Sequence, residues 1–124
     1  MRRCLLAPIL MISALVLALP VLAGKADVVE VKVRKTGNGI YAFDVTVRHA
    51  DAGWSHYADK WDILAPDGRV LGSRVLLHPH DDEQPFTRSL DDVRIPAGIG
   101  EVTVRAHDKK HGFGGKALKV KLPQ

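Results

Sequence analysis

Apolar and polar residues alternate along most of this chain, and short turn signals interrupt the alternation at regular intervals. The first run covers residues 28–34, where valines alternate with charged residues, and the second covers residues 41–48. A period of two places every other side chain on one face, which is the pattern of a half-buried strand. Thr36-Gly37-Asn38-Gly39 separates the runs and is a strong turn signal, because Asn and Gly tolerate positive φ. The two runs therefore predict a β-hairpin.

Five further short runs follow this hairpin and predict five more strands. They lie at residues 60–64, 69–77, 86–90, 102–106 and 118–122. Gly72 interrupts the alternation of the fourth run, which predicts a bulge or a close backbone approach at that position. No window shows a convincing helical period, so the sequence predicts an all-β fold.

Seven short strands with regular turn signals resemble an immunoglobulin-like or fibronectin-like β-sandwich. Trp61, in the third run, stands where such sandwiches often keep a core tryptophan. The resemblance covers residues 24–124 and implies a seven-stranded antiparallel Ig-like β-sandwich domain. The chain also resembles small exported bacterial proteins of unknown function, a likeness that implies no specific activity.

Residues 1–23 have the pattern of a signal peptide that is cleaved before Gly24. Arg2 and Arg3 precede an apolar run over residues 5–19, and Val21-Leu22-Ala23 fits a small-residue cleavage site. Pro8 and Pro20 interrupt the apolar segment, which favours a cleaved signal over a membrane anchor. We therefore expect an exported domain in the periplasm, without membrane association after cleavage; the extracellular medium is the alternative compartment.

Composition limits the chemistry that residues 24–124 can perform. Cys4, Met1 and Met11 all lie in the predicted signal peptide, so the remaining chain has no sulfur. This excludes disulfides, thiolate nucleophiles, iron–sulfur clusters and cysteine-dependent copper sites there. Without Arg2 and Arg3, the 18 Lys and Arg residues fall to 16 against 14 Asp and Glu. Such a balance, with the signs interspersed, indicates a solvated surface and no nucleic-acid partner.

The six histidines all fall in or beside alternate connections between the predicted strands. If successive strands run antiparallel, alternate connections lie at opposite ends of the domain. One end would then carry only plain turns, and the other would carry the pairs His49 and His56, His78 and His80, and His107 and His111. Converging imidazoles suit Zn(II), Cu(II) or Ni(II), so this end is a candidate metal site.

The individual histidines differ in how well their setting suits metal binding. His78 and His80 share parity in an extended segment, and the proline between them restricts the backbone. His49 has the inward parity of the preceding strand, so we expect it to cap the core instead of binding metal. A solvated surface role for the loop histidines is the alternative. The expected metal ligands are His56, His78, His80, His107 and His111.

The sequence lacks the signatures of the common enzyme classes, and we expect no enzymatic activity. Ser55 lies next to His56 but has no nucleophile elbow, and phosphate-loop, dinucleotide and HExxH motifs are absent. The first hypothesis is an exported protein that holds Zn(II) or Cu(II) through the clustered histidines. The alternative is a metal-free accessory module of an exported protein complex. That module would bind its protein partner through the same loops, with Trp54, Tyr57 and Phe113 as anchors.

Overall fold

The computed structural model describes residues 24–124, so the predicted signal peptide lies outside the described residues. The described part of the chain contains no helix, and hence no helix that could cross a membrane. The predicted all-β class and the number of strands are confirmed. The strands are β1 (Asp27–Gly37), β2 (Ile40–Arg48), β3 (Ala58–Leu64), β4 (Val70–Val75), β5 (Phe86–Arg94), β6 (Glu101–Asp108) and β7 (Leu118–Lys121).

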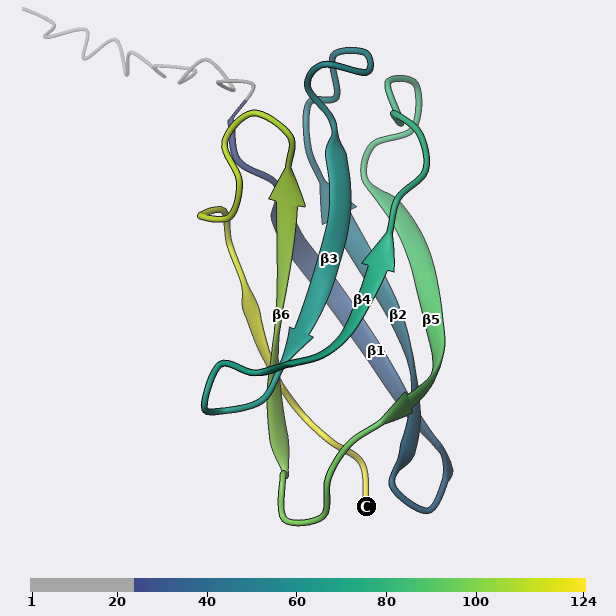
Figure 1. Cartoon of the computed structure of the whole chain (residues 1–124). Coiled ribbons are helices and arrows are strands. Elements are labelled where there is room, and N and C mark those ends of the chain that lie inside the picture. Colours follow the sequence, from purple (N-terminus) through teal and green to yellow (C-terminus); the bar gives the residue numbers. More distant parts are fainter. Residues whose placement is uncertain (1–23) are drawn as a thin grey trace, which may run out of the picture.

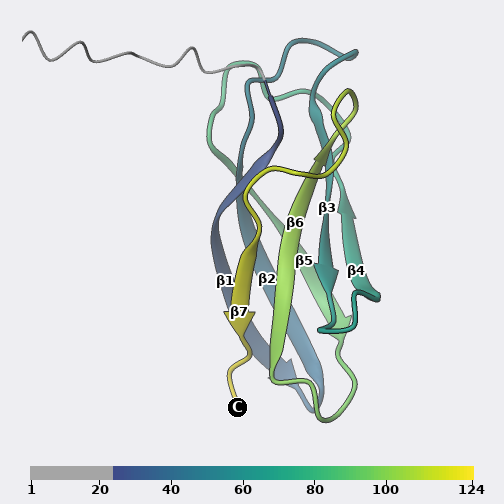
Figure 2. The same cartoon turned by 90° about the vertical axis from the view of Figure 1, so that its left-hand side faces the viewer.

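The strands form two antiparallel sheets that lie face to face (Figures 1 and 2). One sheet has the order β1-β2-β5 and the other has the order β4-β3-β6-β7. The predicted hairpin is β1 with β2, which pair from Asp27 opposite Arg48 to Gly37 opposite Ile40, with register shifts after Val28 and after Lys35. Both sheets are half-buried, because alternate side chains of each strand point between them.

The core lies between the sheets and is built from the alternating positions that the sequence indicates. Phe43, Val45 and Val47 of β2 are fully buried, as are Trp61 and Ile63 of β3. Trp61 is therefore a core tryptophan, as predicted. Burial of each such side chain stabilises the fold by about 1.5–3 kcal/mol, before the cost of ordering the chain is subtracted.

Gly72 marks both an irregular register and a close approach of the two sheets. Ile63 pairs with Gly72 but Leu64 pairs with Val70, so β4 carries one extra residue there. A Cβ at Gly72 would lie 3.2 Å from the side chain of Leu90 in the opposite sheet. The predicted bulge and close approach are both confirmed.

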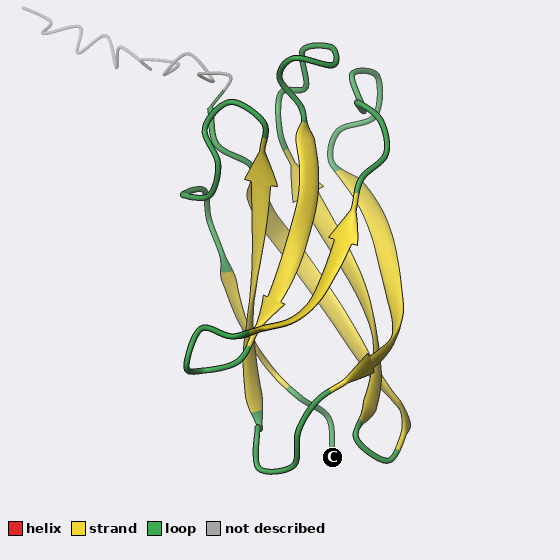
Figure 3. Ribbon diagram, viewed as in Figure 1, coloured by secondary structure: helices red, strands yellow, loops and turns green. Residues whose placement is uncertain are grey.

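The three long connections gather at one end of the molecule, together with the start of the described chain (Figures 1 and 3). They are residues 49–57, 76–85 and 109–117, and we call this end the loop end. The short β1–β2, β3–β4 and β5–β6 connections lie at the opposite end (Figure 1). All six histidines therefore lie in or beside the loop end, as the strand alternation predicts.

A matched pair of valines tests the assignment of core and surface. Val104 of β6 is fully buried, whereas Val75 of β4 is 58% exposed. We expect Val104→Ala to reduce the free energy of unfolding by about 2 kcal/mol, because it removes buried methyl groups and leaves a cavity. Val75→Ala should change it by less than about 0.5 kcal/mol. Urea unfolding of both variants measures this, and equal losses would contradict the described core.

Candidate metal site

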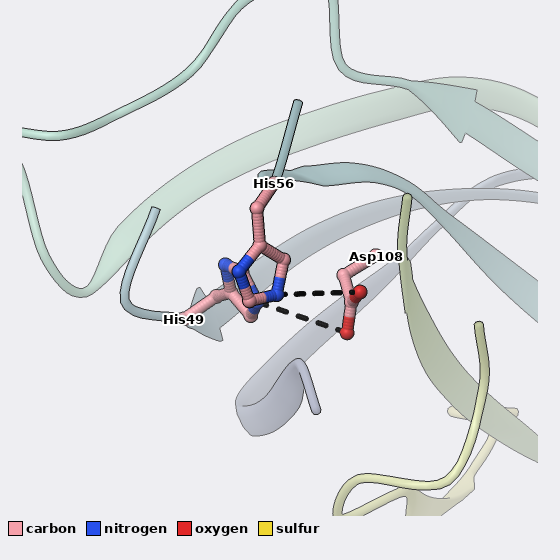
Figure 4. A group of neighbouring side chains, drawn as sticks. All are labelled: His49, His56 and Asp108. Carbon is pink, nitrogen blue, oxygen red and sulfur yellow. Dashed lines mark ion pairs between the residues drawn. The ribbon is translucent and has the colours of Figure 1, made fainter. Parts of the chain in front are cut away.

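Three buried side chains at the loop end form a compact group of atoms that could bind a metal ion (Figure 4). His49 follows β2, His56 precedes β3, and Asp108 is the last residue of β6. One potential ligand atom of each lies within 4.8 Å of the others. Asp108 Oδ1 lies 3.6 Å from His56 Nε2, and Asp108 Oδ2 lies 3.7 Å from His49 Nε2. These distances are close to the roughly 3.4 Å that separates ligand atoms around tetrahedral zinc with bonds near 2.1 Å.

Asp51 sets the orientation of His49. Because residues of β2 alternate, His49 has the inward direction of Val47, and its side chain has no exposed surface. Its Nδ1 lies 2.5 Å from Asp51 Oδ1, so Nδ1 carries a proton and donates it to the carboxylate. This carboxylate–histidine pair is the usual support of a metal-binding imidazole, because it turns Nε2 toward the ion. Here Nε2 faces the carbonyl oxygen of Gly24 at 2.9 Å and Asp108 Oδ2 at 3.7 Å.

The turn that follows β6 holds Asp108 through hydrogen bonds to one carboxylate oxygen only. Its Oδ1 accepts hydrogen bonds from the main-chain N–H groups of Lys110 at 2.8 Å and His111 at 2.6 Å. Its Oδ2 is buried and has no hydrogen-bond partner among the described residues, and the same is true of His56 Nε2. An unpaired buried polar atom costs about 1–3 kcal/mol. A cation bound within this group could pair with both atoms and remove that cost.

Of the five ligands predicted from the sequence, the structure brings only His56 into this group. The ring of His111 lies beside it, with its centroid 5.0 Å from that of His56, in an edge-to-face arrangement. His78, His80 and His107 lie elsewhere at the loop end, in contact with other partners, and their assignment as ligands stays a prediction.

His80 is packed inside the fold, and its Nε2 already has a hydrogen-bond partner. It is buried, and its ring stacks on Phe86 with centroids 3.9 Å apart. Arg88 Nη2 lies 2.9 Å from His80 Nε2 and donates to it, so the Nε2 lone pair is occupied. Burial is the main cause that lowers the pKa of His80 below 6.5, and the charges of Arg88 and His78 add to the effect. His80 is therefore a neutral imidazole with its proton on Nδ1.

His107 and His78 each have a local contact outside the group. His107 Nδ1 lies 2.6 Å from Asp59 Oδ1, and its ring meets that of Phe113 at 4.7 Å. His78 is exposed, and its Nδ1 lies 3.0 Å from the carbonyl oxygen of Pro79.

The sequence did not indicate Asp108 as a candidate ligand, and it assigned His49 only to the core. The inward parity of His49 was the correct signal for its burial, and the structure shows that a buried histidine at this strand end also reaches the group. Asp108 had no comparable signal, because it was expected to lie in the loop beyond a strand ending near residue 106.

Comparisons with known proteins identify a relative but no family. No family model matches the chain, and no solved structure matches it. A protein of Halomicrobium mukohataei named "Putative lipoprotein" is 43% identical over 96 residues, which are 77% of this chain and 47% of that protein. The chain therefore spans about half the length of this curated relative.

The lowered pKa of His80 predicts a stability change in mildly acidic solution. The unfolded chain binds a proton at His80 near pH 6.5, whereas the folded chain does so only at lower pH. Protonation of His80 therefore does not affect the free energy of unfolding well above pH 6.5. That free energy decreases as the pH falls through the interval between the unfolded and folded pKa values of His80. We expect the melting temperature of the chelator-treated wild type to fall between pH 7.5 and pH 5.5, and His80→Gln to reduce that fall.

His78→Gln is the matched control for this measurement. It removes an exposed neighbouring imidazole but leaves the burial of His80, the largest cause of the lowered pKa, in place. The control should therefore keep most of the pH-dependent fall. A fall of the same size in wild type and His80→Gln would contradict the neutral state of His80.

Proposed function

We propose that this protein is an exported metal-binding protein that holds Zn(II) or Cu(II) through His49, His56 and Asp108. One observation carries the proposal. Two imidazoles and one carboxylate converge in a buried group, and His56 Nε2 and Asp108 Oδ2 have no hydrogen-bond partner among the described residues. A buried polar group is normally paired, so two unpaired atoms in one buried group favour a ligand there.

The chemistry of these donors limits the class of ion. Imidazole nitrogen and carboxylate oxygen suit borderline divalent ions such as Zn(II) and Cu(II). Residues 24–124 contain no sulfur, so they offer no soft ligand that would select Cu(I). Asp51 behind His49 adds the supporting hydrogen bond that such sites use.

Burial of the ligands favours a role in holding the ion over a role in catalysis. The side chains of His49 and Asp108 have no exposed surface, and that of His56 is 10% exposed. A catalytic ion needs a coordination position that substrate can reach. We therefore propose uptake, buffering or delivery of the ion, without an enzymatic reaction.

Export and the finer fold assignment belong to the same proposal. The strand orders β1-β2-β5 and β4-β3-β6-β7 support an Ig-like sandwich over residues 24–124. The name of the Halomicrobium mukohataei relative supports export, because lipoproteins are exported proteins. Together with the signal-peptide pattern of residues 1–23, this favours the periplasm as the compartment.

Metal titration of the protein that begins at Gly24, prepared without a histidine tag, tests this function. We expect calorimetry at pH 7.5 to show one tightly bound Zn(II) or Cu(II) per chain. At pH 5.5 the binding should weaken strongly, because a protonated imidazole cannot bind metal. Asp108→Asn should weaken binding by at least about 100-fold, because it removes a charged ligand while keeping the shape of the side chain.

His78→Gln is the control that separates this site from the ligands predicted by sequence. It removes an exposed imidazole outside the group, so the affinity should stay within about twofold of wild type. The proposed site is wrong if Asp108→Asn binds like wild type, or if His78→Gln loses the ion while Asp108→Asn keeps it.

A second candidate function is a protein-binding module that uses the same loop end. The observation in its favour is the exposure of two large apolar side chains there, Trp54 at 64% and Leu77 at 75%. Exposed aromatic residues on loops are frequent anchors at protein interfaces. The other two anchors expected from the sequence are less accessible. Tyr57 is buried, and Phe113 is half-buried with Arg105 3.6 Å above its ring.

Capture from a native periplasmic extract tests this alternative. We expect a protein that is retained by the wild type to be lost when Trp54→Ser and Leu77→Ser are combined, because both substitutions remove exposed apolar surface. Val70→Ser is the control, since Val70 is also exposed, at 52%, but lies at the start of β4, away from the loop end. Equal retention by all three proteins would rule out this surface.

A further inference from the structure

The beginning of the described chain is attached to the loop end close to the metal-ligating group. Gly24 precedes Ala26, which is buried, and Val28 N–H donates to the carbonyl oxygen of Lys116 at 2.8 Å. Lys116 N–H donates in return to Asp27 Oδ1 at 2.6 Å. A Cβ at Gly115 would collide with the carbonyl group of Ala26, so glycine is needed for this close approach. The segment before β1 is therefore held against the β6–β7 connection.

This attachment places the carbonyl oxygen of Gly24 beside the candidate site. The oxygen lies 2.9 Å from His49 Nε2, the atom that also faces Asp108 Oδ2 at 3.7 Å. Gly24 thus shares with Asp108 the side of the imidazole that would bind a metal ion.

Both ring nitrogens of His49 lie next to oxygen acceptors, but a neutral imidazole has only one N–H to donate. Its Nδ1 faces a carboxylate oxygen of Asp51, and its Nε2 faces the carbonyl oxygen of Gly24, so both neighbours are acceptors. A neutral imidazole carries a single N–H, and Asp51 at 2.5 Å takes it. The Nε2 lone pair then points at the lone pairs of an oxygen. A cation on this side of the ring would have Nε2, the carbonyl oxygen of Gly24 and Asp108 Oδ2 as its neighbours.

We propose that Gly24 completes the metal site, with its carbonyl oxygen and, after cleavage before Gly24, its free amino group binding the same ion as His49, His56 and Asp108. This inference rests on the proposed metal-binding function and on the predicted cleavage site. The amino nitrogen and carbonyl oxygen of one residue can close a five-membered chelate ring around an ion. Glycine has the conformational freedom to adopt the geometry that this ring requires.

Removal of the signal peptide thereby becomes the step that creates the full site. Before cleavage the nitrogen of Gly24 belongs to a peptide bond, whose lone pair is delocalised into the carbonyl group and is a poor ligand. After cleavage it is an α-amine, which gives up its proton to bind metal. The precursor would therefore hold the ion weakly inside the cell, and the exported protein would hold it tightly.

Acetylation of the amino terminus tests this inference with little change to the fold. Two forms of the chain that begins at Gly24 are compared, one with a free amine and one with an acetylated amine. We expect the acetylated form to bind Zn(II) and Cu(II) at least about tenfold more weakly at pH 7.5, because one ligand of the chelate is lost. Equal melting temperatures of the two metal-free forms would show that the fold is unaffected.

Proton release provides a second measurement that a purely structural effect would not change. Near pH 7 an α-amine with a pKa of about 7.7–8.0 is mostly protonated, so binding through it releases nearly one additional proton. Calorimetry in buffers of different ionisation enthalpy should detect this proton for the free form and not for the acetylated form.

The outcomes separate this inference from the proposed function. Tight binding by the free form, weaker binding by the acetylated form and loss of binding in His56→Ala of the free form support both. Equal affinity and equal proton release in the two forms overturn the role of Gly24, while a site that still depends on His56 remains. If neither form binds either ion, both proposals are wrong.

Discussion

The buried carboxylate of Asp51 is the contact on which the arrangement of the loop end depends. Its side chain has no exposed surface, so its charge must be compensated by hydrogen bonds. Oδ1 accepts from His49 Nδ1 and from the main-chain N–H of Ala58, and Oδ2 accepts from the main-chain N–H of His80 at 2.7 Å. These bonds join the β2–β3 and β4–β5 connections, and they also fix the direction of His49.

Asp108 is as buried as Asp51, but the two carboxylates differ in their hydrogen bonds. This difference suggests a different role for each acid. Both oxygens of Asp51 accept hydrogen bonds, so its charge is used to support the loops. Asp108 uses Oδ1 for the turn after β6 and directs Oδ2 toward His49, where no hydrogen bond forms among the described residues. Under the proposed function, Asp51 positions a ligand and Asp108 is itself a ligand. Gly24 reaches the same place because the β6–β7 connection holds the segment before β1.

Most of the fold could be predicted from local patterns, whereas only the location of the candidate site and one of its residues, His56, could be predicted. Alternation indicated the strands and the burial of Trp61, and Gly72 indicated the irregularity in β4, because both depend on neighbouring positions. The choice among the histidines rested on local pattern alone, since His78 and His80 looked preorganised by the proline between them. In the structure, Arg88 occupies the Nε2 lone pair of His80, and His78 is exposed. Neither the contact of Arg88 with His80 nor the exposure of His78 has a signature in the local sequence.

By itself, the sequence determined that the chain forms two-faced strands and that its six histidines lie at one end. Both results follow from a period of two and from antiparallel alternation, which do not depend on side-chain detail. Only the tertiary structure decided that His49, His56 and Asp108 meet. In irregular connections the direction of a side chain depends on contacts with other connections. Here, the buried charge of Asp51 and the turn around Asp108 select those directions.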